Sequence, residues 1–140
     1  MTLHVELLMP DRVLWSGESG LVIAKTMDGD LGVLTGHSPV LGILAEGSLV
    51  RIVDPEGAEG SEGSAGQEVV AAVSSGFLAV ADDRVSILSR QAQLGFEVDT
   101  GAVQAELEVA LEGVGPVAPE EEPTEVRYAR ARLRAAGERS

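Results

Sequence analysis

The chain has 140 residues, which is enough for one domain with a substantial core and a small appendage. Hydrophobic residues make up 44% of the chain and aromatic residues only 3%, so we expect an aliphatic core and no base-stacking surface. The formal net charge of −13 repels phosphate backbones and anionic lipid head groups, which argues against binding to nucleic acid or directly to a membrane.

The chain contains no cysteine, which excludes disulfides, a thiolate nucleophile and a cysteine zinc site, and is typical of a reducing compartment such as the cytoplasm. Its longest uncharged run, residues 31–45, is too short and too often interrupted by glycine and proline to span a bilayer. Charges at Glu6, Asp11 and Arg12 make the N-terminal segment unlike a signal peptide. Any membrane association is therefore expected to come through partners.

Residues 1–95 are expected to form a β domain, because Gly, Pro, Asp and Ser separate many short apolar runs there. Apolar and polar residues alternate over positions 3–7, before a turn at Pro10 and Asp11. Further strand-like runs lie at 20–27, 31–34, 48–53, 68–73, 77–81 and 84–89.

Two connections in this domain have distinct compositions. The sequences FLAVA and RVSIL, joined by Asp82 and Asp83, predict a β-hairpin, although this turn lacks the glycine that two-residue turns usually contain. Residues 54–68 are rich in Gly, Ser and Glu and have no large apolar side chain to bury, so they are expected to form a mobile, acidic hairpin tip.

Residues 96–140 are expected to form a two-helix hairpin, because the pattern changes after Asp99. Apolar residues then recur at helical spacing, and Asp99 is a suitable N-cap, which predicts a helix over about 99–112. The glycines and prolines of 113–123 end this helix and form a connector that also carries three consecutive glutamates.

A second helix is expected over about 124–136, with Thr124 as its cap. Its spacing predicts a narrow apolar stripe made of Val126, Ala129, Leu133 and Ala136. An adjacent stripe is basic and consists of Arg127, Arg130 and Arg134. Both helices are too short to be stable alone, so they need each other, the β domain or a partner.

The glycine-rich stretch DGDLGVLTGHSP, residues 28–39, has the composition of a catalytic or phosphate-binding loop. It carries two acids, no lysine or arginine, and lies between strand-like segments, which argues against a phosphate cradle. His37 and Ser38, with Asp28 or Asp30 nearby, allow the hypothesis of a small hydrolase. Neighbours on an extended chain seldom have the geometry of a catalytic triad, so a turn histidine bonded to backbone is the simpler interpretation.

No catalytic set, metal site or cofactor is expected from the remaining residues. His4 and His37 lie far apart in the sequence and have no other soft ligands beside them. The acids of residues 54–68 do not have the alternating spacing of a calcium loop. The residues alone therefore leave no convincing catalytic set.

Several segments, in order and over nearly the whole chain, resemble the epsilon subunit of the F-type ATP synthase. These segments are VELLMPDRVLWSGE, DGDLGVLTGHSPVLGIL, GSLVRIV and SSGFLAVADDRVSILS, followed by the two-helix tail. The most specific of them is GDLGVLTGHSP, and the second most specific is SGFLAVADDRVSIL.

The resemblance implies an α+β protein in which a ten-stranded β-sandwich, or flattened barrel, precedes an antiparallel helical hairpin. It also implies a non-enzymatic subunit of the central stalk, whose β domain binds the gamma subunit and rests on the ring of c subunits. In many members the helices extend toward the alpha and beta subunits of the catalytic head and inhibit ATP hydrolysis. The implied location is peripheral, on the cytoplasmic face of the bacterial cell membrane.

The resemblance assigns partner contacts to an acidic turn facing the c ring and to the rest of that motif. The matching residues are Asp28, Gly29, Asp30, Gly32, Gly36, His37 and Pro39. Acids on a turn can pair with basic residues of a ring loop, which contributes orientation more than affinity. A generic all-β binding adaptor remains the alternative on the residues alone.

The tail departs from the family motif through which some members bind ATP. In the aligned stretch VDTGAV, residues 98–103, Asp99 matches, but Ala102 replaces the arginine. Loss of the guanidinium removes a donor for phosphate, so nucleotide binding by this route is not expected. Arg127, Arg130 and Arg134 could contact acidic surfaces of the catalytic head, or could simply pair with Glu120–Glu122 or Glu125.

Overall fold

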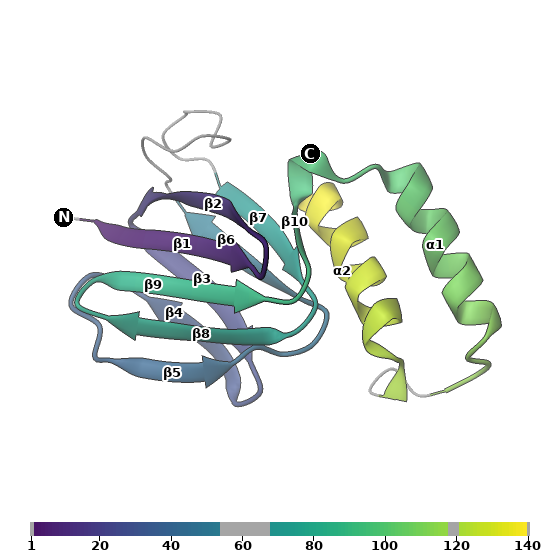
Figure 1. Cartoon of the computed structure of the whole chain (residues 1–140), viewed down its shortest axis with the longest axis horizontal. Helices are drawn as coiled ribbons and strands as arrows, with labels where there is room; N and C mark the ends of the chain where they lie inside the picture. The colour runs from purple at the N-terminus through teal and green to yellow at the C-terminus, as the bar shows by residue number, and fades with distance from the viewer. Residues whose placement is uncertain (1, 54–67, 118–120, 140) are drawn as a thin grey trace.

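The computed structural model describes residues 2–53, 68–117 and 121–139, which form two facing β-sheets and a pair of helices (Figure 1). The first sheet consists of β1 (Leu3–Met9), β2 (Arg12–Ser19), β5 (Val40–Ile43), β8 (Gly76–Ala81) and β9 (Arg84–Ser89). The second consists of β3 (Leu21–Thr26), β4 (Gly29–Val33), β6 (Ser48–Val53), β7 (Glu68–Val73) and β10 (Ala92–Leu94). The β-sandwich of ten strands followed by two helices confirms the implied fold.

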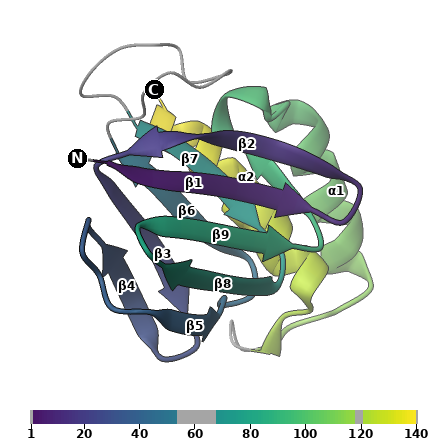
Figure 2. The same ribbon diagram turned by 60° about the vertical axis from the view of Figure 1, so that its left-hand side comes forward.

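The strand order is β2–β1–β9–β8–β5 in the first sheet and β10–β7–β6–β3–β4 in the second. Figure 2 shows the first sheet in front of the second. Neighbouring strands are antiparallel except for β1 and β9, which run parallel. Strands β4 and β5 are therefore edge strands, one in each sheet.

The core between the sheets is aliphatic, as the composition predicts. It contains side chains such as Leu3, Val22, Ile52 and Ile87, none of which has any exposed surface. Trp15 of β2 is 2% exposed and belongs to the same core. Burying one such large side chain contributes about 1.5–3 kcal/mol, so the sandwich has a substantial core of its own.

The hairpin of β8 and β9 confirms the prediction from FLAVA and RVSIL, with Ala81 paired to Arg84. Asp82 and Asp83 have φ of 51° and 60°, so both adopt the left-handed conformation that a type I′ turn requires. Aspartate tolerates this conformation better than most residues because its short side chain can bond locally. The Asp83 carbonyl also accepts a hydrogen bond from the His4 N–H at 2.9 Å.

Strands β2, β5 and β10 were not recognisable from the residue pattern. In β2 the buried positions, Trp15 and Ser19, do not form a repeating apolar face. In β5 four consecutive residues are apolar or glycine, so alternation is absent from the sequence. The acidic segment expected to be a mobile tip falls, except for Glu68 at the start of β7, outside the described residues.

A short 3₁₀ turn, η1 (Gly95–Glu97), leads from β10 to α1 (Thr100–Glu112), and α2 (Thr124–Arg139) follows. The Asp99 carboxylate caps α1 by accepting a hydrogen bond from the Ala102 N–H at 3.1 Å. Figures 1 and 2 show α2 beside the second sheet, with α1 on the far side of α2. Thr124 is the first residue of α2, and its hydroxyl donates to Glu46 Oε1 at 2.7 Å.

Helix α2 buries two faces rather than the single stripe predicted from its sequence. One face packs on α1, and its cluster includes Val103, Leu107, Val126, Ala129 and Leu133. The other face packs on the second sheet, and its cluster consists of Leu49, Val70, Ala72, Tyr128, Ala131 and Ala135. The small alanines allow a close approach to the sheet, and they gave no distinct signal in the sequence because alanine is also common on exposed helix faces.

Helix α2 approaches the sandwich closely at Gly47, in the turn between β5 and β6. A Cβ atom at Gly47 would lie 2.3 Å from Arg127 Cβ and 2.5 Å from the Arg127 carbonyl carbon. Gly47 also has φ +60°, which side chains rarely adopt. In the docked position of α2, this turn therefore has room only for glycine.

Substitution Gly47→Ala should displace α2, because the added methyl group has no space and the backbone becomes strained. We expect the opening free energy of the α2 amides, measured by native-state hydrogen exchange, to fall by about 2–4 kcal/mol. The matched control is Gly115→Ala, since Gly115 has φ +75° but no neighbour within 4 Å of its Cβ position. Equal effects of the two substitutions on α2 would contradict the close packing.

Candidate functional site

The acidic turn, residues 28–30, follows β3 and lies on the surface. The buried Thr26 hydroxyl holds its shape by accepting a hydrogen bond from the Asp28 N–H at 3.1 Å and donating one to the Gly29 carbonyl at 2.8 Å. Gly29 has φ +119°, a conformation that strongly favours glycine. The backbone therefore presents the carboxylates of Asp28 and Asp30 on a well-defined turn.

The second half of the motif forms another turn, between β4 and β5. The His37 N–H donates to the Leu34 carbonyl at 3.2 Å, and Gly36 has φ +83°. The Gly36 N–H donates to Asp83 Oδ1 at 2.7 Å, which ties this turn to the β8–β9 hairpin. This half of the motif therefore has a clear architectural role.

The structure does not bring the seven candidate residues together at one point. The acidic turn and the turn at Gly36 and His37 lie at opposite ends of β4, about 15 Å apart for a strand of this length. Gly32 lies within β4, where a Cβ would make only an ordinary contact with Leu21, at 4.0 Å. Pro39 is exposed just before β5.

The hydrolase hypothesis requires His37 to bond a serine hydroxyl on one side and a carboxylate on the other. Instead, His37 Nδ1 lies 2.7 Å from the backbone carbonyl oxygen of Ser38, to which it donates. Asp28 and Asp30 belong to the turn at the other end of β4. Within the described part of the chain, no group of three His, Asp or Glu residues is placed to hold a metal ion.

An exposed apolar patch, which the sequence reasoning missed, lies beside the acidic turn. It consists of Met27, Leu41, Ile43 and Phe77, which are 69%, 72%, 65% and 45% exposed. Ile43 of β5 pairs with Phe77 of β8, and the Met27 N–H donates to the Ile43 carbonyl at 2.8 Å. Large apolar side chains gathered on the surface mark an interaction site.

The patch exists because β5 places its glycine inward and its large residues outward. A Cβ at Gly42 would lie only 3.0 Å from Leu78 Cδ2 and 3.4 Å from Thr26 Cγ2, so the inner face leaves little room for a side chain there. Leu41 and Ile43, on either side of Gly42, therefore face solvent. The only available signal in the sequence was the lack of polar residues from Val40 to Leu44, which is equally typical of a buried strand.

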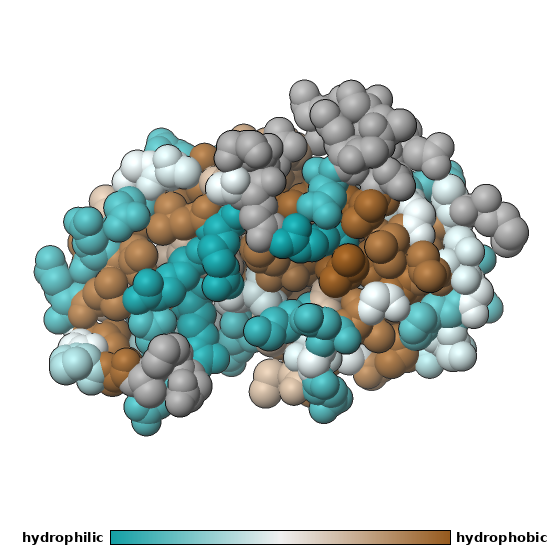
Figure 3. All heavy atoms as spheres, turned by 180° about the vertical axis from the view of Figure 1, so that it is seen from behind, coloured by the Kyte–Doolittle hydropathy of each residue, from teal (hydrophilic) through white to brown (hydrophobic). Residues whose placement is uncertain are grey.

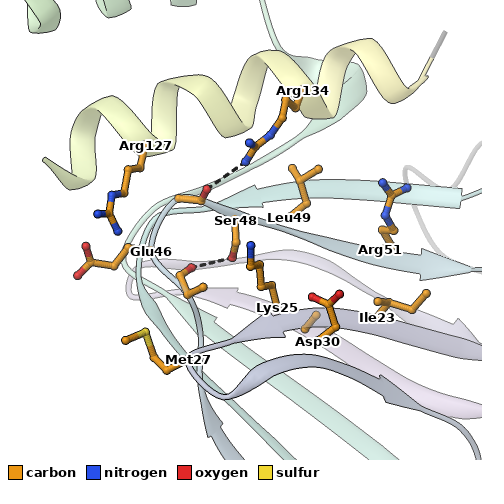
Figure 4. A pocket seen from close by; sticks show the side chains of 13 residues that line it. Ile23, Lys25, Met27, Asp30, Glu46, Ser48, Leu49, Arg51, Arg127 and Arg134 are labelled. Carbon is orange, nitrogen blue, oxygen red and sulfur yellow. Dashed lines mark hydrogen bonds between the residues drawn. The ribbon is translucent and has the colours of Figure 1, made fainter. Parts of the chain in front are cut away.

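A groove of about 720 Å³ is lined by residues of α2, β3, β6 and the turn at Gly47 (Figure 4). Its lining includes four of the chain's ten lysine and arginine residues, namely Lys25, Arg51, Arg127 and Arg134. Asp30 and Glu46 line it as well, and Arg51 forms an ion pair with Glu68 at 3.1 Å. Seen from behind in Figure 3, hydrophilic residues form a band near the junction of helices and sandwich.

The three arginines of the basic stripe have different surroundings. Arg134 Nη2 donates to the Gly47 carbonyl at 3.3 Å, and Arg127 packs against Gly47. Arg130 forms a two-point ion pair with Glu122, at 2.9 and 3.0 Å, so in the docked position of α2 this arginine pairs locally. Such a partly exposed pair contributes at most about 1 kcal/mol, so it can be exchanged for another partner.

Arg132, which the sequence reasoning did not select, joins the two helices. Its Nη2 forms an ion pair with Glu106 of α1 at 2.9 Å, and its guanidinium lies 4.6 Å from the ring centroid of Tyr128. Burial raises the pKa of Tyr128 above its ordinary value, while the positive charge of Arg132 opposes this change. The tail is therefore held by cation–π and ionic contacts as well as by apolar packing.

Asp99, the one residue matching the family's nucleotide motif, has a structural use as the N-cap of α1. Ala102, at the arginine position, is exposed and supplies the N–H that this cap binds. None of the helices in the described residues is both long and apolar enough to cross a membrane.

Comparisons with known proteins identify relatives of the sandwich domain and of nearly the whole chain. The family model for the β-sandwich domain of the ATP synthase delta/epsilon chain matches residues 2–95. The ATP synthase epsilon chain of Thermobifida fusca is 46% identical over 96% of this chain and 91% of that protein. The epsilon chain of Streptomyces avermitilis is 41% identical over 98% of this chain and 97% of that protein.

Two solved structures share the fold. A chain of the Euglena gracilis mitochondrial ATP synthase, solved with its c-ring, has a TM-score of 0.67 and 21% identity, covering 97% of this chain and 81% of that chain. A chain of the Tetrahymena thermophila central stalk and c-ring has a TM-score of 0.58 and 15% identity, with coverage of 99% and 96%. This chain belongs to the epsilon-chain family of the ATP synthase, whose members are accessory rather than catalytic subunits.

Proposed function

We propose that this chain is a rotor subunit of the central stalk, which binds the gamma subunit and the c ring and turns with them. The observation that carries the proposal is the corner of the sandwich where the acidic turn adjoins the apolar patch. Through this corner, proton-driven rotation of the ring is coupled to the catalytic head during ATP synthesis. The place of action is the cytoplasmic face of the bacterial membrane, reached through partners.

The two parts of the corner suit two partners. Asp28 and Asp30 provide charge on a defined turn, which suits basic loops of the c ring and fixes orientation. The apolar patch provides area that is favourable to bury, which suits a stable contact with gamma. The backbone hydrogen bond from the Met27 N–H to the Ile43 carbonyl joins the two parts across the two sheets, so both contacts are carried by one packed body.

The C-terminal helices are proposed to inhibit ATP hydrolysis when α2 leaves the sandwich. Arg127, Arg130 and Arg134 would then exchange their present surroundings for acidic surfaces of the catalytic head. Arg134 gives up one long, partly buried hydrogen bond and Arg130 one partly exposed ion pair in doing so, and such an ion pair is worth at most about 1 kcal/mol. Nucleotide sensing through Asp99 is not part of the proposal, because Asp99 serves as a helix cap and Ala102 lacks a guanidinium.

Replacing Asp28 and Asp30 together by asparagine should weaken binding to a gamma–c-ring subcomplex about 3- to 10-fold at low salt, since each exposed pair is worth up to about 1 kcal/mol. The difference should shrink at high salt because exposed charges are screened. The control is Asp82→Asn, at the far end of β8 from Phe77. Unchanged affinity of the double variant would remove the acidic turn from the interface.

Replacing Leu41 and Ile43 by serine should weaken binding to gamma at least about 10-fold, because two apolar side chains no longer become buried. The free energy of unfolding should change little, since both side chains are already exposed in the free chain. Val13→Ser is the matched control, because Val13 is 55% exposed on the other edge strand, β2. If neither the double serine variant nor Val13→Ser weakens binding to gamma, the result would argue for a generic adaptor.

Replacing Arg127, Arg130 and Arg134 by alanine should raise ATP hydrolysis by the reconstituted complex, because the tail loses its contacts with the acidic head. Arg84→Ala, an exposed arginine of β9, is the control and should leave hydrolysis at the level of the unmodified complex. If inhibition is unchanged in the triple variant, the braking role does not belong to these arginines.

A further inference from the structure

One short segment, residues 43–47, links the residues directly before the acidic turn to α2; we call it the bridging turn. Its first half is bonded to the end of β3, directly before the acidic turn. The Met27 N–H donates to the Ile43 carbonyl at 2.8 Å, and the Ala45 N–H donates to the Lys25 carbonyl at 2.9 Å. Leu44 forms a β-bridge with Thr26, the residue whose hydroxyl shapes the acidic turn.

The second half of the bridging turn carries the docking point of α2. Glu46 accepts a hydrogen bond from the Thr124 hydroxyl at 2.7 Å, at the start of the helix. Gly47 meets the backbone of Arg127 with no room for a Cβ, and its carbonyl accepts a hydrogen bond from Arg134. Figure 4 shows Arg127 and Arg134 directed from α2 toward this turn.

The bridging turn is held firmly between these two contacts. The Leu44 N–H donates to the Gly76 carbonyl and the Gly47 N–H to the Ser74 carbonyl, both at 2.9 Å. Leu44 is 1% exposed, so its side chain is fixed in the core. The Ser48 hydroxyl closes the turn by donating to the Ala45 carbonyl at 2.7 Å. A packed segment of this kind transmits a displacement rather than absorbing it.

We propose that the bridging turn couples two events, so that docking of α2 on the sandwich makes the acidic turn more rigidly ordered. Release of α2 removes three contacts from one end of the segment and loosens the bonds to Lys25 and Met27 at the other end. By linkage, a partner that orders the acidic turn must favour the docked α2 to the same extent. That last step rests on the proposed function, because it takes the c ring as the partner of the acidic turn.

The coupling assigns a regulatory meaning to contact with the ring. While the ring holds the acidic turn, α2 is stabilised on the sandwich and its arginines stay away from the catalytic head. When the corner loses its partner, α2 is released more readily. This control works through the chain's own backbone contacts and does not require a small-molecule ligand.

The test is hydrogen exchange of the full-length isolated chain carrying Ala131→Glu. Ala131 has no exposed surface and faces the second sheet, so a carboxylate there releases α2 without changing the bridging turn. We expect the Met27 and Ala45 amides to exchange at least fivefold faster than in the unmodified chain. The control is Ala105→Glu, the same change on the exposed face of α1, which should alter these rates less than twofold.

The coupling would be overturned if Ala131→Glu speeds exchange throughout α2 but leaves the exchange rates of Met27 and Ala45 within twofold of those in the unmodified chain. An α2 that stays protected in both the Ala131→Glu and the Gly47→Ala chains would also overturn it, because the device needs a releasable helix. If Ala131→Glu unfolds the sandwich, a milder double variant, Thr124→Ala with Arg134→Ala, is used in its place. It should speed exchange of the same two amides at least twofold, and unchanged rates would again overturn the proposal.

These measurements use no partner, so they separate the coupling from the proposed function. In one outcome, release of α2 speeds exchange of Met27 and Ala45 in the isolated chain, but the variant lacking Asp28 and Asp30 binds the ring as tightly as the unmodified chain. That outcome would contradict only the assignment of the ring as the partner. The opposite result is that the variant lacking Asp28 and Asp30 binds the ring less tightly, while release of α2 leaves the exchange rates of Met27 and Ala45 unchanged. That result would contradict only the coupling through the bridging turn. A ring–gamma subcomplex that slows α2 exchange in the unmodified chain, but not in that variant, is the result expected when both hold.

Discussion

The arrangement of this molecule depends on how closely α2 approaches the turn between β5 and β6. At Gly47 the helix backbone occupies the space that any side chain would need, and the left-handed conformation of Gly47 points its carbonyl to Arg134. This contact sets the position of α2, and α2 in turn positions α1 through the cluster around Val103 and Leu107. The tail is thus attached to the sandwich through α2, which meets the Gly47 turn and packs one face on the second sheet.

The same turn belongs to the corner where the two sheets meet. There the edge strand β5 is joined to β3 by backbone bonds, with the acidic turn on one side and the apolar patch on the other. A stiff aliphatic core lies behind the corner, so force applied to the surface is transmitted without local unfolding. A body of this kind suits a subunit that carries torque between partners and has no chemistry of its own.

The sequence predicted those features that depend on local pattern. The β8–β9 hairpin and the Asp99 cap were visible because alternation and capping are local signals, whereas the acidic turn was implied only by the family resemblance. The apolar patch was not visible, since Leu41 and Ile43 look like core residues until the inward position of Gly42 is known. The contact at Gly47 and the second face of α2 depend on residues far apart in the chain, and a glycine or alanine gives no local sign of what it will touch.

The central claim is that the corner of the sandwich is where the rotor partners bind, and site-directed cross-linking tests it most directly. The chain contains no cysteine, so single substitutions Asp28→Cys and Ile43→Cys report on one position each. In an assembled complex with cysteines introduced into the loops of the c ring and into gamma, a disulfide should form from position 28 to the ring and from position 43 to gamma. Cross-links that form only from Val13→Cys, on the opposite edge of the first sheet, would contradict it.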